Sequence, residues 1–175
     1  MPTKARSLGA YQDKRDFSIT SEPASSKAAP GAGPLVFMVH KHAATQLHYD
    51  LRIELDGVLV SWAVPKGPSS NVRDKHLAVH VEDHPLAYGG FEGVIPKGQY
   101  GGGPSMIWDA GTFSPDEGGR LYWEDRQGAQ DEVRDGLANG KLSLTFRGRK
   151  LKGSWTLVRT KRAPNEWLLI KHKDA

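Results

Sequence analysis

Histidine, aspartate and arginine alternate with apolar residues in the segment from His42 to Arg52, and this spacing could hold a metal ion. From Leu47 to Leu55, apolar residues occupy one parity, whereas His48, Asp50 and Arg52 occupy the other. A period of two is typical of a half-buried strand, so these polar side chains share one strand face. Two histidines and an aspartate suffice to bind a divalent cation with open coordination positions, and a neighbouring arginine suits a substrate oxyanion. The pattern favours a metal-assisted phosphoryl site, although a solvent-exposed strand face alternates in the same way.

A tight turn and a second strand favour a cavity wall over a solvated strand face. Asp56-Gly57 predicts a two-residue hairpin turn, and Val58 to Val64 has the pattern of the partner strand. The turn sets a register in which Ser61 lies opposite the arginine and Ala63 lies opposite the aspartate. These small residues leave room for a ligand on the polar face.

A third strand with a polar face is predicted between Leu77 and Pro85, where Glu82 and His84 share one parity. Six of the seven histidines lie between positions 40 and 84. This concentration favours a metal or acid–base centre, because imidazole has an unperturbed pKa near neutral pH. Some of these histidines could serve only as hydrogen-bonding neighbours of the site. The candidates for that lesser role are His40, His76 and His80.

Composition limits the class of protein. The 175 residues, 38% of them hydrophobic, fit one domain with its own core. Cysteine is absent, which excludes disulfides and thiolate metal sites and leaves histidine and carboxylate as metal ligands. No apolar run has the length of a membrane span, and the N-terminus lacks the apolar core of a signal peptide. We therefore expect a cytoplasmic protein without membrane contact, whose net charge of +4 is compatible with a polyanionic partner.

Short apolar runs separated by glycine, proline, asparagine and aspartate predict the fold from Leu35 onward. We expect residues 35–175 to form a mainly β domain, a compact closed or nearly closed β-barrel with minor helix. Residues 1–34 have the composition of a flexible basic arm, and Ala24 to Pro34 that of a linker. One helix is expected, over Gln130 to Asn139. Later strands are expected over Ser105–Trp108, Lys141–Phe146, Gly153–Arg159 and Trp167–Lys171.

Two further features are less specific. The glycine-rich run from Gly98 to Pro104 lacks the Gly-Lys-Ser/Thr ending of a phosphate-binding loop, so it predicts a turn between strands. Basic residues towards the C-terminus are compatible with contact to a nucleic-acid backbone and equally with ordinary solvation of the surface. They are Arg147, Arg149, Lys150, Lys152, Arg159, Lys161 and Arg162.

Seven motifs occur in the order of a known family. They are Phe37-Met-Val-His-Lys-His42, Leu47-His-Tyr-Asp-Leu-Arg52, Ser61-Trp-Ala-Val-Pro-Lys-Gly67, Val81-Glu-Asp-His-Pro85, Phe91-Glu-Gly-Val-Ile-Pro96, Tyr100-Gly-Gly-Gly103 and Ile107-Trp-Asp109. Together with Lys14-Arg15-Asp16-Phe17 and Glu22-Pro23 in the arm, they resemble the 3′-phosphoesterase domain of bacterial and archaeal DNA ligase D. The resemblance covers nearly the whole chain.

This resemblance implies a small β-barrel hydrolase that depends on manganese or a similar divalent cation. It would remove a 3′-phosphate and a 3′-terminal ribonucleoside from the ends of primer-template DNA during end-joining repair. The implied partners are DNA or DNA/RNA primer-template 3′ ends, together with ligase and polymerase domains and Ku. A nucleoid-associated location is expected on the same basis.

The resemblance also assigns roles to individual residues. The metal ligands fall on His42, His48 and Asp50, the residues chosen by spacing. Phosphate contacts fall on Arg52, Lys66 and His84, and Tyr88 supports them. The residues matched to the phosphomonoesterase step are Arg15, Asp16, Glu22 and Glu82.

Two positions depart from the family pattern. Many members carry glutamine where His40 stands and arginine where His76 stands. A phosphate-binding His76 in place of arginine would lack a permanent positive charge, so we expect a pH-sensitive clamp and weaker phosphatase activity.

The residues favour direct attack by water, because no serine or cysteine nucleophile is paired with a histidine. Arg52 and Lys66 would stabilise charge in the transition state, and His84 is the candidate general acid. A phosphohistidine intermediate remains an open alternative.

Two rival functions belong to other classes of protein. A non-haem metal oxygenase or cupin-like enzyme could use His48, Asp50 and His84 as its triad. A non-catalytic module that binds DNA ends would retain the basic surface with a decayed site.

Overall fold

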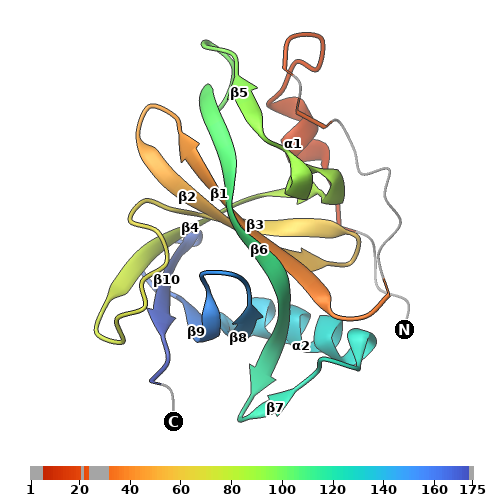
Figure 1. The fold of residues 1–175 in the computed structure, drawn as a ribbon, viewed down its shortest axis with the longest axis vertical. Helices are drawn as coiled ribbons and strands as arrows, with labels where there is room; N and C mark the ends of the chain where they lie inside the picture. Colours follow the sequence, from red (N-terminus) through yellow and green to blue (C-terminus); the bar gives the residue numbers. More distant parts are fainter. Residues whose placement is uncertain (1–5, 21, 24–31, 174–175) are drawn as a thin grey trace.

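A closed antiparallel β-barrel forms the body of the protein (Figure 1). The computed structural model describes residues 6–20, 22–23 and 32–173. The barrel strands are β1 Leu35–Ala43, β2 Leu47–Leu55, β3 Val58–Val64, β4 Lys75–Pro85, β6 Gly103–Glu117, β8 Lys141–Arg147, β9 Lys152–Arg159 and β10 Glu166–Lys171. They pair in the order β1-β2-β3-β4-β10-β9-β8-β6, and β6 returns to β1. Two short strands, β5 Gly93–Ile95 and β7 Arg120–Leu121, also pair with β6. The predicted closed, mainly β barrel is confirmed.

The predicted hairpin register is also confirmed. Arg52 pairs with Ser61, and Asp50 pairs with Ala63. The turn residues Asp56 and Gly57 have φ of 49° and 84°, as a tight hairpin turn between right-twisted strands requires. The polar face of β2 is thereby fixed relative to β3, because a slip of one residue would turn every side chain to the other face.

Two elements are longer than the sequence predicted. Strand β6 runs from Gly103 to Glu117, because it pairs with β1 and later with β8. Helix α2 spans Arg126–Asn139 and begins before the predicted Gln130, because the Asp125 side chain accepts a hydrogen bond from Gly128 N and caps it. No helix in the described part of the chain is both long and apolar enough to cross a bilayer.

The barrel strands bury one face in the core, and β1 to β4 turn residues of the other face towards the candidate site. Apolar side chains from all eight barrel strands and from α2 form the main core, which includes Leu51 and Trp62. His48, Asp50 and Arg52 have the opposite parity on β2 and therefore point away from that core. A second cluster packs on this outer side, and its buried residues are Tyr11, Met38, Leu59, Tyr88, Phe91 and Ile95. The candidate site thus lies outside the barrel wall.

The N-terminal arm packs against the barrel next to this outer face. Its described part contains a short helix that the sequence did not predict, α1 Gly9–Asp13. The 3₁₀-helix η1, Leu86–Gly90, follows β4 on the same side of the barrel. The Arg6 guanidinium makes two hydrogen bonds to the Asp83 carboxylate of β4, at 2.6 and 3.1 Å. Residues 24–31 of the predicted linker lie outside the described residues.

Candidate functional site

Three potential metal ligands converge near the turn that joins β1 and β2. His42 and His48 are directly paired across the two strands, and Asp50 lies two residues further along β2. One ligand atom from each residue lies within 4.8 Å of the others. The Asp50 carboxylate is 3.2 Å from His48 Nε2 and 3.7 Å from His42 Nδ1. The residues that spacing selected are therefore assembled in one group that could hold a metal ion.

The donor set and its surroundings fit a divalent cation. Burial alone would raise the pKa of Asp50, but the Arg52 charge and hydrogen bonds from both histidines outweigh it and hold the pKa well below its usual range. The carboxylate is therefore ionised. Among the described residues, His42 Nε2 is buried without any hydrogen-bond partner, and coordination is one way to satisfy such an atom. Two imidazoles and one carboxylate leave further coordination positions for water or substrate.

Arg52 lies buried beside these ligands, and its guanidinium is held by three different partners. Nε donates to His40 Nδ1 at 3.2 Å, one Nη donates to Ser61 Oγ at 2.9 Å, and the other lies 3.4 Å from Asp50 Oδ2. The guanidinium carbon also lies 4.7 Å from the centre of the Tyr88 ring. Ser61 thus serves as a hydrogen-bond acceptor as well as a small residue.

His40 has a fixed protonation state in this arrangement. Burial and the positive charge of Arg52 lower the pKa of His40 to about 3. Its Nδ1 accepts from Arg52, and its Nε2 donates to Phe91 O at 3.1 Å. A glutamine side chain could also provide one acceptor and one donor here. The expected pH sensitivity therefore does not extend to His40, which is neutral at physiological pH.

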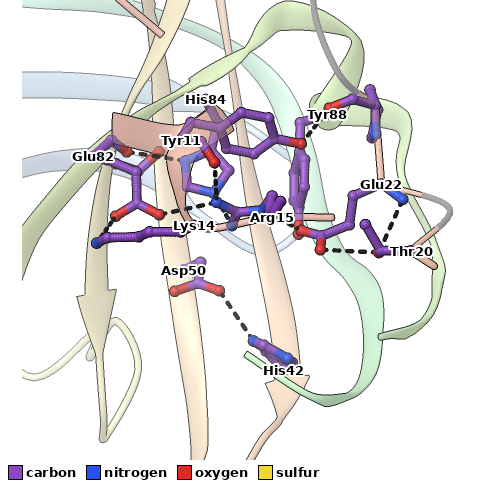
Figure 2. Close-up of polar contacts among 12 residues, drawn as sticks. Tyr11, Lys14, Arg15, Thr20, Glu22, His42, Asp50, Glu82, His84 and Tyr88 are labelled. Carbon is purple, nitrogen blue, oxygen red and sulfur yellow. Dashed lines mark hydrogen bonds and ion pairs between the residues drawn. The ribbon is translucent and has the colours of Figure 1, made fainter. Parts of the chain in front are cut away.

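Arg15 from the arm links the outer face of the barrel to a buried carboxylate (Figure 2). Its Nε lies 2.9 Å from Glu22 Oε2, and one Nη lies 3.3 Å from Glu82 Oε1. Glu22 also accepts a hydrogen bond from Tyr88 Oη at 2.8 Å and one from Thr20 Oγ at 3.0 Å. The arm is therefore bound to β4 and η1 through buried charged hydrogen bonds.

His84 contacts the second Nη group of Arg15. Its Nδ1 donates to Glu82 O at 2.9 Å, and its Nε2 accepts from Arg15 at 3.3 Å. Burial lowers the pKa of His84 well below its usual value, and the charges of Arg52 and Arg15 lower it further. In this arrangement His84 is a neutral imidazole whose Nε2 is a hydrogen-bond acceptor.

A cavity of about 240 Å³ opens onto these groups. The predicted site residues in its wall are Arg15, His42, His48, Asp50, Arg52, Glu82, His84 and Tyr88. Glu22 is not part of the wall, but it binds two residues that are, Arg15 and Tyr88. These nine predicted residues, counted with Glu22, are thus brought together around one cavity.

Three other predicted site residues lie outside the cavity wall. Asp16 is exposed, and its carboxylate accepts hydrogen bonds from the backbone and the hydroxyl of Ser18. Lys66 is exposed in the loop between β3 and β4. The His76 ring bonds to Gly67 O at 2.6 Å, and its other nitrogen lies 3.6 Å from Asp74. Any role of these residues would require substrate to extend to them or the loops to move.

Sequence reasoning did not identify several residues that shape the site. Tyr11 is fully buried, and its ring lies 3.9 Å from the Arg15 guanidinium carbon and 4.9 Å from the His84 ring. Its spacing of four residues before Arg15 could have suggested this contact. Tyr100 and Gly101 also line the cavity. They come from the glycine-rich run that the sequence predicted to be only a turn.

Comparison with known proteins shows the family of this chain. Residues 40–159 match the family described as the DNA Ligase D 3′-phosphoesterase domain. The chain belongs to this family. The match includes the metal-ligand group, Arg52 and His84, whereas the arm lies before it.

Curated relatives extend the similarity into the arm. The chain is 45% identical over 177 aligned residues to the multifunctional non-homologous end joining protein LigD of Pseudomonas aeruginosa, which covers 99% of this chain and 19% of that protein. It is 39% identical to the LigD of Mycobacterium tuberculosis, over 95% of this chain and 20% of that protein. It is 38% identical to the LigD of Mycolicibacterium smegmatis, over 97% of this chain and 21% of that protein. The chain spans about a fifth of the length of these relatives.

The metal-ligand group yields a prediction about cation binding. His42→Ala should weaken binding of Mn²⁺ by about a hundredfold or more. Removing a residue that only supports a metal ligand typically costs about 10- to 100-fold in metal affinity, and removing a ligand itself should cost more. Isothermal titration calorimetry measures this affinity, and circular dichroism checks that the fold persists. His172→Ala is the matched control, since His172 bonds to Thr156 and lies outside the cavity wall. Equal Mn²⁺ affinity in folded His42→Ala and the parent would contradict the assignment.

The fork geometry of Arg52 yields a second prediction. Arg52→Ala should lower turnover of a 3′-phosphorylated DNA end by about a hundredfold or more, if Arg52 stabilises charge in the transition state. Arg52→Lys should restore only part of the rate, because one ammonium group cannot reach three partners in the plane of a guanidinium. The exposed Arg149 provides the control substitution Arg149→Lys. Steady-state kinetics decide the point, and full activity of Arg52→Lys would exclude the proposed fork.

Proposed function

We propose that this protein is a metal-dependent DNA 3′-end-processing phosphoesterase that removes a 3′-phosphate and a 3′-terminal ribonucleoside during end-joining repair. The observation that carries the proposal is one cavity whose wall combines the group His42, His48 and Asp50 with Arg52 and Arg15. A phosphoryl group is an anion that suits two guanidinium groups beside a bound cation. The names of the relatives, which describe end-joining proteins, support the biological setting.

The proposed chemistry divides the work between the cation site and the arginines. The residues that would hold the cation are His42, His48 and Asp50, and manganese is the proposed ion. When bound, a divalent cation polarises a phosphoryl oxygen and lowers the pKa of water. Arg52 is preorganised by its three partners, so it can stabilise transition-state charge without rearranging.

His84 is the proposed general acid for the departing 3′ oxygen. In the described arrangement its Nε2 accepts a hydrogen bond from Arg15 and carries no proton. A phosphate bound in the cavity adds negative charge and would raise the pKa of His84, because a nearby negative charge favours the imidazolium form. Arg15 would then turn its N–H groups to the phosphate. His84 Nε2 would then take up a proton from solvent and become the acid that the reaction needs.

The oxygenase alternative is less well supported by the geometry. Its triad would need His84 as a metal ligand, but the metal-ligand group contains His42 instead. His84 is bound to Arg15, and a guanidinium is poorly placed beside a cation unless an anion lies between them. A phosphoryl group supplies that anion. A purely DNA-binding module would not require the ionised Asp50 and the buried Arg52.

Both proposed reactions can be followed on one labelled strand, and the arm supplies the most discriminating variant. With Mn²⁺, the parent should convert a primer-template ending in one ribonucleotide to a 3′-phosphate end and then to a 3′-hydroxyl end. Glu22→Ala should slow phosphate removal far more than resection, so that the 3′-phosphate end accumulates. Glu22 positions Arg15 and Tyr88, and a terminal phosphate is held from one side only. Denaturing gel electrophoresis separates the three ends.

Two neighbouring acids provide comparisons for Glu22. Asp16→Ala should act in the same direction but more weakly, because Asp16 shapes the turn with Ser18 that precedes Glu22. Asp13→Ala removes an exposed carboxylate at the end of α1 and should change neither step. Equal loss of both steps in Glu22→Ala would exclude a selective role. Absence of both products from the parent with every divalent cation would refute the proposed function itself.

A further inference from the structure

The glycine-rich loop between β5 and β6 forms part of the wall of the metal-site cavity. Gly101 lies against His42, where an added Cβ would stand 3.3 Å from Cε1. At Gly103, φ is 135°, and a Cβ would stand 2.0 Å from Ala43 O. Only glycine fits so close to the backbone of β1. The sequence Gly98 to Gly103 therefore permits the loop to lie directly against the proposed metal ligands.

A second cavity, of about 500 Å³, lies along the same loop. Its wall includes Thr45 from the β1–β2 turn, Val94 and Ile95 from β5, and Lys97 and Gln99 from the loop. Ile95 lines both cavities, so the two are neighbours that share one wall residue. β5 and the loop that follows it lie at the top of Figure 1, beside the first residues of β6.

The second cavity contains no predicted site residue, yet it has the features of a ligand site. Val94, a wall residue, is 66% exposed, so its apolar side chain is accessible to a ligand. The exposed side chain of Val94 stands beside a hydroxyl, an amide and an ammonium group, those of Thr45, Gln99 and Lys97. A pocket of several hundred Å³ that combines apolar walls with a few polar groups is typical of small organic ligands.

We propose that this second cavity is a nucleoside subsite, which holds the sugar and base of the nucleotide whose 3′ oxygen carries the phosphate in the metal-site cavity. A nucleoside offers an apolar ring face to the exposed Val94, and base-edge hydrogen-bonding groups to Gln99. Lys97 can meet the next phosphate of the strand. The shared residue Ile95 gives the short separation that neighbouring parts of one nucleotide require.

This inference rests on the proposed function for the identity of the strand, so its test includes a measurement without turnover. The probes are two fluorescently labelled primer-templates that both end in a 3′-phosphate, one on a normal nucleotide and the other on an abasic one. Their dissociation constants are measured by anisotropy in EDTA, with the parent, Val94→Asp and Gln99→Ala. Leu121→Asp is the matched control, because Leu121 is an exposed residue of β7, at the far end of the barrel in Figure 1.

The parent should prefer the base-bearing end about tenfold, the effect expected for one base held by a binding surface. Val94→Asp and Gln99→Ala should reduce this ratio towards one, whereas Leu121→Asp should keep it. The proposal is overturned if the parent has no preference, or if both cavity variants keep it or weaken the two probes equally. With Mn²⁺ added, KM for the abasic end should exceed KM for the base-bearing end by the same factor, and kcat should be equal for the two ends. A parent that has the binding preference but releases no phosphate would contradict the proposed function and leave the subsite supported.

Discussion

The buried guanidinium of Arg52 organises the candidate site. It contacts His40, Ser61 and Asp50 at once. These partners lie on β1, β3 and β2, respectively. A buried charge is costly unless its hydrogen bonds are made, so these partners constrain the spacing of β1, β2 and β3. This charge is the largest single influence that lowers the pKa of Asp50, and hydrogen bonds from His42 and His48 act in the same direction. The metal-ligand group and Arg52, the proposed phosphate contact, are therefore one electrostatic unit.

The arm adds further charged groups beside Arg52 and the metal-ligand group. Arg15 lies between two carboxylates, Glu22 of the arm and Glu82 of β4, and also donates to His84. Tyr88 connects the two sets of charged groups, because its ring faces Arg52 and its hydroxyl donates to Glu22. Displacing the arm would leave several of these groups without partners. The arm is thus a structural part of the cavity wall, in addition to being a basic segment.

The outer-face location explains why so many parts of the chain contribute to the site. A site in the barrel interior would be lined by strands alone. Here the strands supply most of the lining, and the arm, η1 and the glycine-rich loop complete it. Such loops can differ between related proteins without altering the barrel core, because few core contacts depend on them.

The sequence by itself determined the parts that depend on local periodicity and turn chemistry. The alternation in β2 and the Asp56-Gly57 turn set the β2–β3 register, and with it the common face of His48, Asp50 and Arg52. The alternation and the family motifs selected His42, His48 and Asp50, the group that could hold a metal ion. Helix α2 was predicted too short, because its start depends on the Asp125 cap rather than on apolar periodicity.

Tertiary structure decided which polar residues share the cavity. His40, His76 and His84 all belong to polar faces of predicted strands, and the sequence does not distinguish their contacts. In the structure His40 accepts a hydrogen bond from Arg52 and His84 accepts one from Arg15. His76 instead bonds to a loop carbonyl, Gly67 O. Burial, which depends on the packing of distant segments, sets the low pKa of His40 and His84. The roles of Tyr11 and of the glycine-rich loop likewise depend on contacts across the whole chain. Local pattern fixes which face a side chain takes, but only the closed barrel and the packed arm fix what it meets there.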